Sequence, residues 1–241
     1  MRRWILIGLL GLGALASCSV KEDRSDAACW ITVTAETSTS MSIWYGSQRI
    51  LDNHPGSLVD HMVPRGTVDL VASNNDRFTV SEGEQMSELF AQLQHLDTDG
   101  EFAYAGVELK KQFANVYLDF KEEDDGRTGY NLLVTGTVYG ADNHTLRPVE
   151  GVFRCTPEPL ADTRGYSFRA PRQKEESLTL RLLSEGETVD TIPLGELIRK
   201  AGFDWTKESL GDVSILCDLP AHTFTITVME WEGPVTFEIT M

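Results

Sequence analysis

The feature that most limits the fold of this chain is an alternation of apolar and polar residues that recurs from Cys29 onward. Successive side chains of a β-strand point to opposite faces, so this period of two predicts strands with one face on a core. The clearest segments are 31–33, 68–70, 116–120, 178–182, 213–215, 224–228 and 235–239. Turn-forming clusters separate them at short intervals, which favours antiparallel β-sandwiches over βαβ units.

Two short helices are expected to interrupt the strands. Residues 81–84 have the spacing of a capping box, and apolar residues follow at helical intervals up to Leu93. A second apolar stripe, 194–201, ends at Gly202, the residue type that commonly closes a helix, and we expect Trp205 to pack beneath it. The predicted fold is all-β with two short helices. We place the boundary between an N-terminal sandwich, 29–148, and a C-terminal sandwich, 149–241, after a turn-rich stretch.

The first seventeen residues have the layout of an export signal, with two arginines followed by an apolar run, 4–16. As a helix this run is roughly 20 Å long, which is short of a hydrocarbon core of roughly 30 Å. The run ends in Leu15-Ala16-Ser17-Cys18, which resembles a lipobox. The resemblance implies acylation of Cys18 and cleavage between Ser17 and Cys18. The alternative is an ordinary signal peptide with a chance cysteine.

Residues 18–28 are mostly polar and are expected to form a flexible tether between the acylated cysteine and the folded body. Lys21, Glu22 and Asp23 resemble the acidic tag that routes Bacteroidales lipoproteins to the cell surface. The chain is therefore expected on the outer membrane, held by its acyl chains. We favour the outer leaflet over the periplasmic one.

The charge of the chain argues against nucleic-acid binding. It has 21 basic and 37 acidic residues, a net charge of −16, and the predicted cleavage removes two of the basic residues. Such a balance repels phosphate backbones. No zinc-helix spacing, nucleophile elbow or phosphate loop occurs in the expected mature chain, and 122–126 lacks the ligand spacing of a calcium loop. We therefore predict no catalytic residues, no metal and no cofactor, and a protein that is not an enzyme.

Three cysteines remain after Cys18 is acylated, so they cannot all pair within the chain. Cys217 continues the apolar side of the segment that contains Val213 and Ile215, which favours a buried thiol. A disulfide between Cys155 and Cys217 is the other reading.

Several ordered pieces of the chain resemble the fimbrium anchoring subunits of Bacteroidales type V pili. They are 20–26 followed by Cys29-Trp30, Gln112-Phe113, 140–142, 169–173, 177–178, 193–196, 202–205, and Val228 with Trp231. The chain departs from the family at Ala27-Ala28, where a Cys-Pro often stands, and at Cys217, where an apolar residue is expected.

The resemblance implies two tandem transthyretin-like sandwiches and a role as the membrane-anchoring base subunit of a fimbria. The implied partners are fimbrial stalk subunits, bound by strand addition or by face docking, and the outer membrane, reached through the lipid anchor. The alternative function is a stand-alone surface lipoprotein that binds carbohydrate or a host ligand, for which clustered exposed aromatic residues would be expected.

Polymerising subunits of the resembled kind lose an N-terminal strand by proteolysis and accept a strand from a neighbour. Here the corresponding segment, 30–34, is continuous with Cys18, so its removal would release the body from the membrane. An anchor that keeps this strand is expected to donate a strand to its neighbour or to dock a finished face. The candidate donor, and so the candidate partner-binding strand, is the alternating segment of Val235, Phe237 and Ile239, because the sequence ends soon after it at Met241. The alternative is that this segment simply closes the second sandwich.

Overall fold

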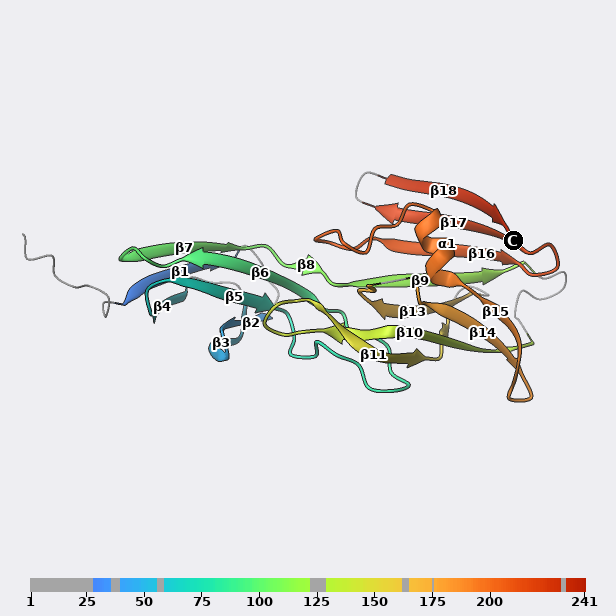
Figure 1. Ribbon diagram of the computed structural model, residues 1–241, viewed down its shortest axis with the longest axis horizontal. Coiled ribbons are helices and arrows are strands. Elements are labelled where there is room, and N and C mark those ends of the chain that lie inside the picture. Colours follow the sequence, from blue (N-terminus) through green and yellow to red (C-terminus); the bar gives the residue numbers. More distant parts are fainter. Residues whose placement is uncertain are drawn as a thin grey trace, which may run out of the picture.

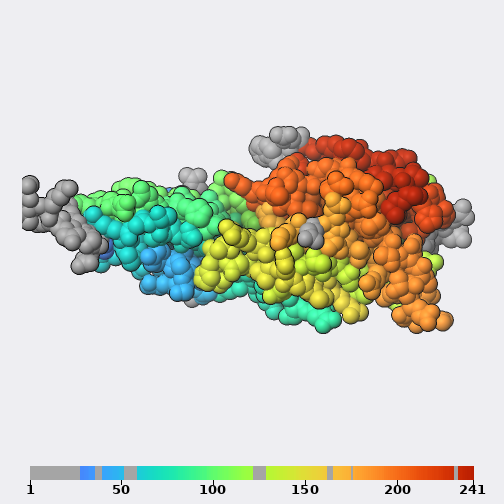
Figure 2. All heavy atoms as spheres, in the orientation of Figure 1, coloured from blue at the N-terminus to red at the C-terminus, as the bar shows by residue number. Residues whose placement is uncertain are grey.

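The computed structural model describes residues 28–35, 40–55, 59–121, 129–161, 165–174, 176–230 and 233–241. Within them the chain forms four β-sheets and one helix, and that helix, at seven residues, is too short to cross a membrane. The sheets form two sandwiches arranged end to end along the long axis of the molecule (Figures 1 and 2). The described chain begins at one end of this axis, and the C-terminal strand lies in the other sandwich.

The N-terminal sandwich contains the first eight strands. One sheet has the order β4-β1-β7 and the other has the order β3-β2-β5-β6-β8. Their bounds are β1 (Cys29–Ala35), β2 (Ser40–Tyr45), β3 (Gln48–Pro55), β4 (Val59–Val63), β5 (Thr67–Ser73), β6 (Phe90–Asp97), β7 (Phe102–Val107) and β8 (Lys110–Lys111). Inward residues of both sheets, among them Ile31, Ile43 and Leu70, share one core.

The C-terminal sandwich contains the remaining ten strands and the helix. Its sheets have the orders β11-β10-β14-β15 and β12-β13-β9-β16-β17-β18. The bounds are β9 (Phe113–Phe120), β10 (Asn131–Ala141), β11 (Pro148–Cys155), β12 (Glu158–Pro159), β13 (Tyr166–Pro171), β14 (Thr179–Ser184), β15 (Glu187–Ile192), α1 (Leu194–Lys200), β16 (Asp212–Asp218), β17 (Thr223–Glu230) and β18 (Gly233–Thr240). Its core joins inward residues of both sheets, such as Val134 and Val213, with Leu197 and Ile198 of α1.

The predicted all-β sandwich fold is confirmed, and the alternation has the predicted cause. Along β9 the residues Val116 and Leu118 are fully buried while Tyr117 and Asp119 are half-buried, and β16 and β17 repeat this pattern. Two pairings are parallel rather than antiparallel: β1 with β7, and β9 with β16. Alternation shows which side chains share a face, but not the direction of the neighbouring strand.

The helix predicted over 81–93 is wrong. Gly83 has a φ of +89°, outside the helical region, and β6 begins at Phe90. The backbone bonds within this segment are short turn contacts, Glu84 N–H to Ser81 O and Leu89 N–H to Ser87 O, and other groups bond far away in the sequence: the Met86 N–H donates to Arg169 O at 3.1 Å, and the Gln112 N–H donates to Leu89 O at 2.9 Å. Met86 and Leu89 are buried, but as part of an extended connection.

The second predicted helix is confirmed as α1. Gly202 follows it with a φ of +82°, and the Gly202 N–H donates to Arg199 O at 2.9 Å. The aromatic residue buried beside the helix is Phe203 rather than Trp205. Trp205 is half-buried and packs edge-on against Phe203, with ring centroids 4.7 Å apart.

The predicted boundary between residues 148 and 149 differs from the pairing of the strands. β9 and β10 lie before it, yet β9 pairs with β13 and β16, and β10 pairs with β11 and β14. The sandwiches divide near Gln112, between β8 and β9. The turn-rich stretch before the predicted boundary connects β10 and β11 inside the C-terminal sandwich. Its turn is organised by the Asp142 carboxylate, which accepts from the N–H groups of His144 and Thr145.

Candidate interaction surface at the edge strand β18

The segment predicted as a partner-binding strand forms β18, the outermost strand of the six-stranded sheet. It pairs with β17 along its whole length, and no other described strand pairs with its outer edge (Figure 1). The Thr227 and Thr236 hydroxyls bond to one another at 3.0 Å across this pair. β18 is therefore the closing strand of its sheet and at the same time an edge open to another chain.

The apolar row of β18 is largely uncovered. Val235, Phe237 and Ile239 lie opposite Val228, Ile226 and Phe224 of β17, which are all buried. One strand further out, Val235 is 52% exposed and Phe237 is 38% exposed, and only Ile239 packs against the core. The buried core of the second sandwich therefore reaches β17 along its whole apolar row but reaches β18 only at Ile239.

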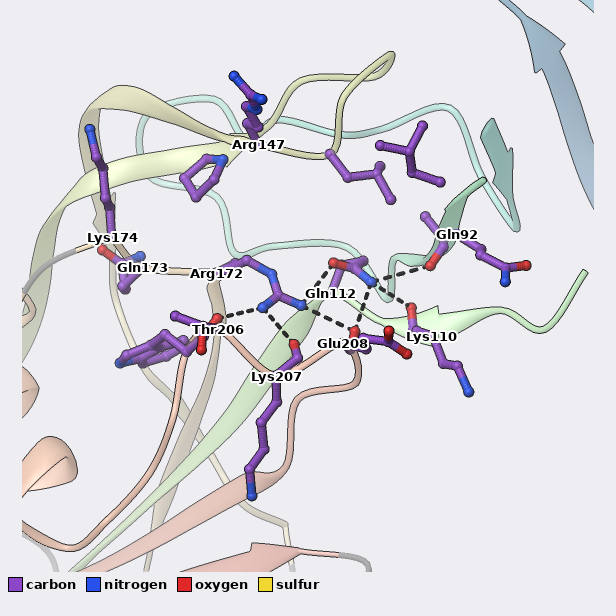
Figure 3. A pocket seen from close by; sticks show the side chains of 15 residues that line it. Gln92, Lys110, Gln112, Arg147, Arg172, Gln173, Lys174, Thr206, Lys207 and Glu208 are labelled. Carbon is purple, nitrogen blue, oxygen red and sulfur yellow. Dashed lines mark hydrogen bonds between the residues drawn. The ribbon is translucent and has the colours of Figure 1, made fainter. Parts of the chain in front are cut away.

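A second candidate region is a cleft of about 480 Å³ where the two sandwiches meet (Figure 3). At its floor the Arg172 guanidinium donates to the backbone carbonyls of Trp205, Lys207 (2.7 Å) and Glu208 (3.2 Å), and to Gln112 Oε1 (3.0 Å). Burial lowers the pKa of Arg172, and nearby Asp204 opposes this shift. Arginine remains protonated at neutral pH even so.

Gln112 completes this arrangement from the other side. Its amide nitrogen donates to the carbonyls of Ala91, Lys110 and Glu208 at 3.1–3.2 Å. These bonds connect β6 and β8 of the first sandwich with the connection that precedes β16 in the second. Arg172 and Gln112 therefore form a polar joint between the sandwiches.

The other cations of the cleft do not converge on a common point. The side chains of Arg147, Lys174 and Lys207 extend away from the Arg172 guanidinium in Figure 3. Lys174 pairs with Glu150, and Lys207 pairs with Glu230. The geometry is that of a structural joint rather than of an anion site.

In the sequence, 169–173 and Gln112 stand out only through their resemblance to the anchoring subunits, which does not predict the joint. A usable signal was present, because Gln112 and Gln173 are polar residues next to apolar strand segments. Both are almost completely buried. Buried polar residues generally have hydrogen-bond partners within the protein, and both side-chain amide nitrogens donate to backbone carbonyls here.

The cysteines Cys29, Cys155 and Cys217 are free thiols and buried, so Cys155 and Cys217 do not form a disulfide. Burial raises the pKa of Cys155 and of Cys217 to about 12. Neither thiol is therefore a candidate nucleophile, because the thiolate is the reactive form.

We expect the folded protein to resist thiol reagents at pH 8. With a pKa near 12, on the order of one thiol in ten thousand is ionised at that pH, and the side chains are also inaccessible. A colorimetric disulfide reagent should release no colour from the body 19–241 within minutes and should titrate Cys29, Cys155 and Cys217 after addition of urea. Rapid labelling of the native protein would contradict the burial of these residues.

The remaining predicted positions, Ser17, Cys18, Lys21, Glu22 and Asp23, lie outside the described residues. Among the residues that are described, no group of three or more histidine, cysteine or acidic side chains is placed to hold a metal ion.

No protein-family model matches the sequence, and no curated protein is similar to it in sequence. Solved structures do resemble the fold. The fimbrial anchor protein Mfa2 from Porphyromonas gingivalis matches with a TM-score of 0.52 and 10% identity, over 85% of this chain and 98% of that one. A "putative adhesin" from Bacteroides ovatus matches with a TM-score of 0.51 and 8% identity, over 87% and 95%. This chain therefore has the tandem-sandwich fold of those two proteins along nearly their whole length.

Proposed function

We propose that this protein is the lipid-anchored base subunit of a fimbria, with acyl chains on Cys18 and with β18 as the strand that joins a stalk subunit. It acts by assembly and not by catalysis. The observation that carries the proposal is the uncovered apolar row on an open sheet edge, Val235 and Phe237, in the sandwich farther from the tether. The likeness in fold to a fimbrial anchor protein supports it.

The chemistry of the joint is strand addition. An open edge offers backbone N–H and C=O groups to an extended segment of another chain, and side-chain pockets give the contact its specificity. A stalk subunit seated on β18 would cover the two exposed apolar side chains, which raises the affinity of the contact. The exposed row and the open edge then belong to a single binding surface.

The position of β1 supports a subunit that keeps its first strand. β1 is the middle strand of its sheet, and its residues Ile31 and Val33 are fully buried. Removal of β1 would separate β4 from β7 and open the core of the N-terminal sandwich. Retention of this strand keeps the body continuous with residue 18, as an anchor requires.

The test replaces Phe237 with Asp in cells that assemble fimbriae. We expect the variant to stay in the membrane fraction while fimbriae detach into the medium, because a charge on the row opposes burial against a partner. Cross-linking on intact cells should recover a stalk subunit with the wild-type protein and not with the variant. Phe237 is already 38% exposed, so the melting temperature should fall by no more than about 4 °C.

Val189→Asp is the matched control. Val189 is 53% exposed on β15, the edge strand of the facing sheet, and its replacement should leave fimbriae attached. Deletion of residues 235–241 tests the strand as a whole. If the deleted body unfolds, β18 serves its own core. If both Asp variants retain fimbriae, β18 is not the joining strand.

A further inference from the structure

The outer face of the sheet β4-β1-β7 carries a cluster of exposed aromatic and apolar side chains. Trp30 is 45% exposed, Met62 53%, Phe102 63% and Tyr104 74%. Each alternates with core residues of its own strand, so all four point away from the sandwich. Together they form what we call the aromatic patch. Soluble proteins seldom leave such a cluster bare unless something contacts it.

Strand register brings these side chains together. Trp30 lies beside Met62 on β4 and beside Phe102 on β7, which makes a row across all three strands. Neighbouring strands are about 4.8 Å apart, so this row is roughly 10 Å wide. Tyr104 extends the patch along β7, opposite Thr32.

The row lies at the end of the molecule where the described chain begins. Trp30 is the second residue of β1, and Phe102 is the first of β7 (Figure 1). Eleven peptide units connect Cys29 to Cys18, and at 3.3–3.6 Å per residue they extend to about 40 Å at most. A lipid anchor on Cys18 therefore keeps the patch near the bilayer surface.

We propose that the aromatic patch rests in the interfacial layer of the membrane that holds Cys18. The inference rests on the lipid anchor of the proposed function, and it adds a second contact that sets the tilt of the body on the bilayer. Trp and Tyr suit this layer because their rings are apolar and their N–H or O–H groups reach water. The tether makes the contact intramolecular, so a weak apolar attraction is sufficient.

Polar groups around the patch favour a lipid surface over a sugar. Sugar recognition needs directed hydrogen-bond partners beside the aromatic platform. Here the Thr32 hydroxyl donates to Asp60 at 2.6 Å, and the Thr34 hydroxyl donates to the Ala105 carbonyl at 3.3 Å, so these groups already bond within the sheet. Asp99 and Glu101 in the adjoining loop are exposed and acidic. They would not attract lipid phosphates, so the contact with the membrane rests on the apolar side chains of the patch.

The experiment uses the mature acylated protein in vesicles of phosphatidylethanolamine and a phosphatidylcholine brominated near the top of its acyl chains. Bromine quenches tryptophan emission only at short range. We expect brominated vesicles to lower the emission of the wild-type protein relative to unbrominated ones. Trp30→Thr should lose this difference, which assigns the quenched emission to Trp30. In the wild-type protein, the emission that comes from Trp30 should be at least twofold lower in brominated vesicles than in unbrominated ones.

A second variant keeps the reporter and alters the patch. Phe102→Ser combined with Tyr104→Ser retains Trp30, and both side chains are too exposed to be needed for folding. We expect the quenching of Trp30 to fall severalfold in this variant, while Val189→Ser on the other sandwich leaves it unchanged.

Flotation of the same vesicles separates the two proposals. Protein that does not float overturns the lipid anchor itself. Protein that floats with Trp30 unquenched overturns only the membrane contact of the patch. A third outcome would also overturn the membrane contact. Trp30 stays unquenched, and the wild-type body binds a glycan or dimerises while the Phe102→Ser, Tyr104→Ser variant does not. The patch would then be assigned to that partner.

Discussion

Replacing Arg172 with Met should lower the melting temperature of the folded body by about 6–12 °C. The guanidinium donates to three backbone carbonyls and to Gln112, and the substitution removes all four of these bonds while leaving Glu208 O only its bond from Gln112 Nε2. Loss of hydrogen bonds to a charged donor of this kind costs roughly 3 kcal/mol in total. In a chain of this size each kcal/mol corresponds to roughly 2–4 °C. Differential scanning calorimetry on residues 19–241 measures the shift.

Arg147→Met is the matched control, because Arg147 lines the same cleft but its guanidinium bonds to no other described residue. It should change the melting temperature by about 2 °C or less. Arg172→Lys should fall between the two, since an ammonium group keeps the charge but cannot reproduce the planar fork of donors. Equal melting temperatures for Arg172→Met and Arg147→Met would show that the joint contributes little to stability.

Replacing Cys18 with Ala should move the protein from the membrane fraction to the soluble fraction and abolish its labelling by fatty acids. Each buried methylene of an acyl chain contributes roughly 0.8 kcal/mol, so loss of two or three chains removes the anchor. Labelling with a clickable palmitate analogue, followed by fractionation, measures both effects.

Ser17→Ala serves as the control for Cys18→Ala, because it keeps a small residue before the cysteine and should leave labelling intact. A Cys18→Ala protein that is still labelled and membrane-bound would rule out this residue as the anchor. Release without any change in labelling would point to acylation at another position.

The strands of this fold could be predicted from the sequence because their cause is local. In β9, β16 and β17 the buried and less buried residues alternate as the apolar pattern indicates, and Gly202 ends α1 as its residue type predicts. The segment 81–93 could not be predicted in this way. Its helical spacing is real, but its backbone groups bond to Arg169 and Gln112, which lie far away in the sequence.

The two candidate surfaces, β18 and the aromatic patch, were likewise predictable only in their local features. The alternation of Val235, Phe237 and Ile239 identified a strand, but its exposure depends on how far the core of the sandwich extends past β17, which no local pattern describes. Trp30 alternates with the buried Ile31, so its outward direction was predictable. Its neighbours Met62 and Phe102 were not, since they come from two other strands, one of them parallel.

The central position of β9 has a consequence for the order in which the chain folds. β9 pairs in parallel with β16. Val116 and Val213 are partners in this pair, and most of the sequence of the second sandwich lies between them. Closing a loop of that length costs on the order of 4 kcal/mol of chain entropy before its contacts form, and such topologies fold slowly. The first sandwich needs nothing beyond Lys111 to complete its sheets. The first sandwich can therefore fold during synthesis, while β9 stays incompletely paired and prone to aggregation until residues 212–218 have been made.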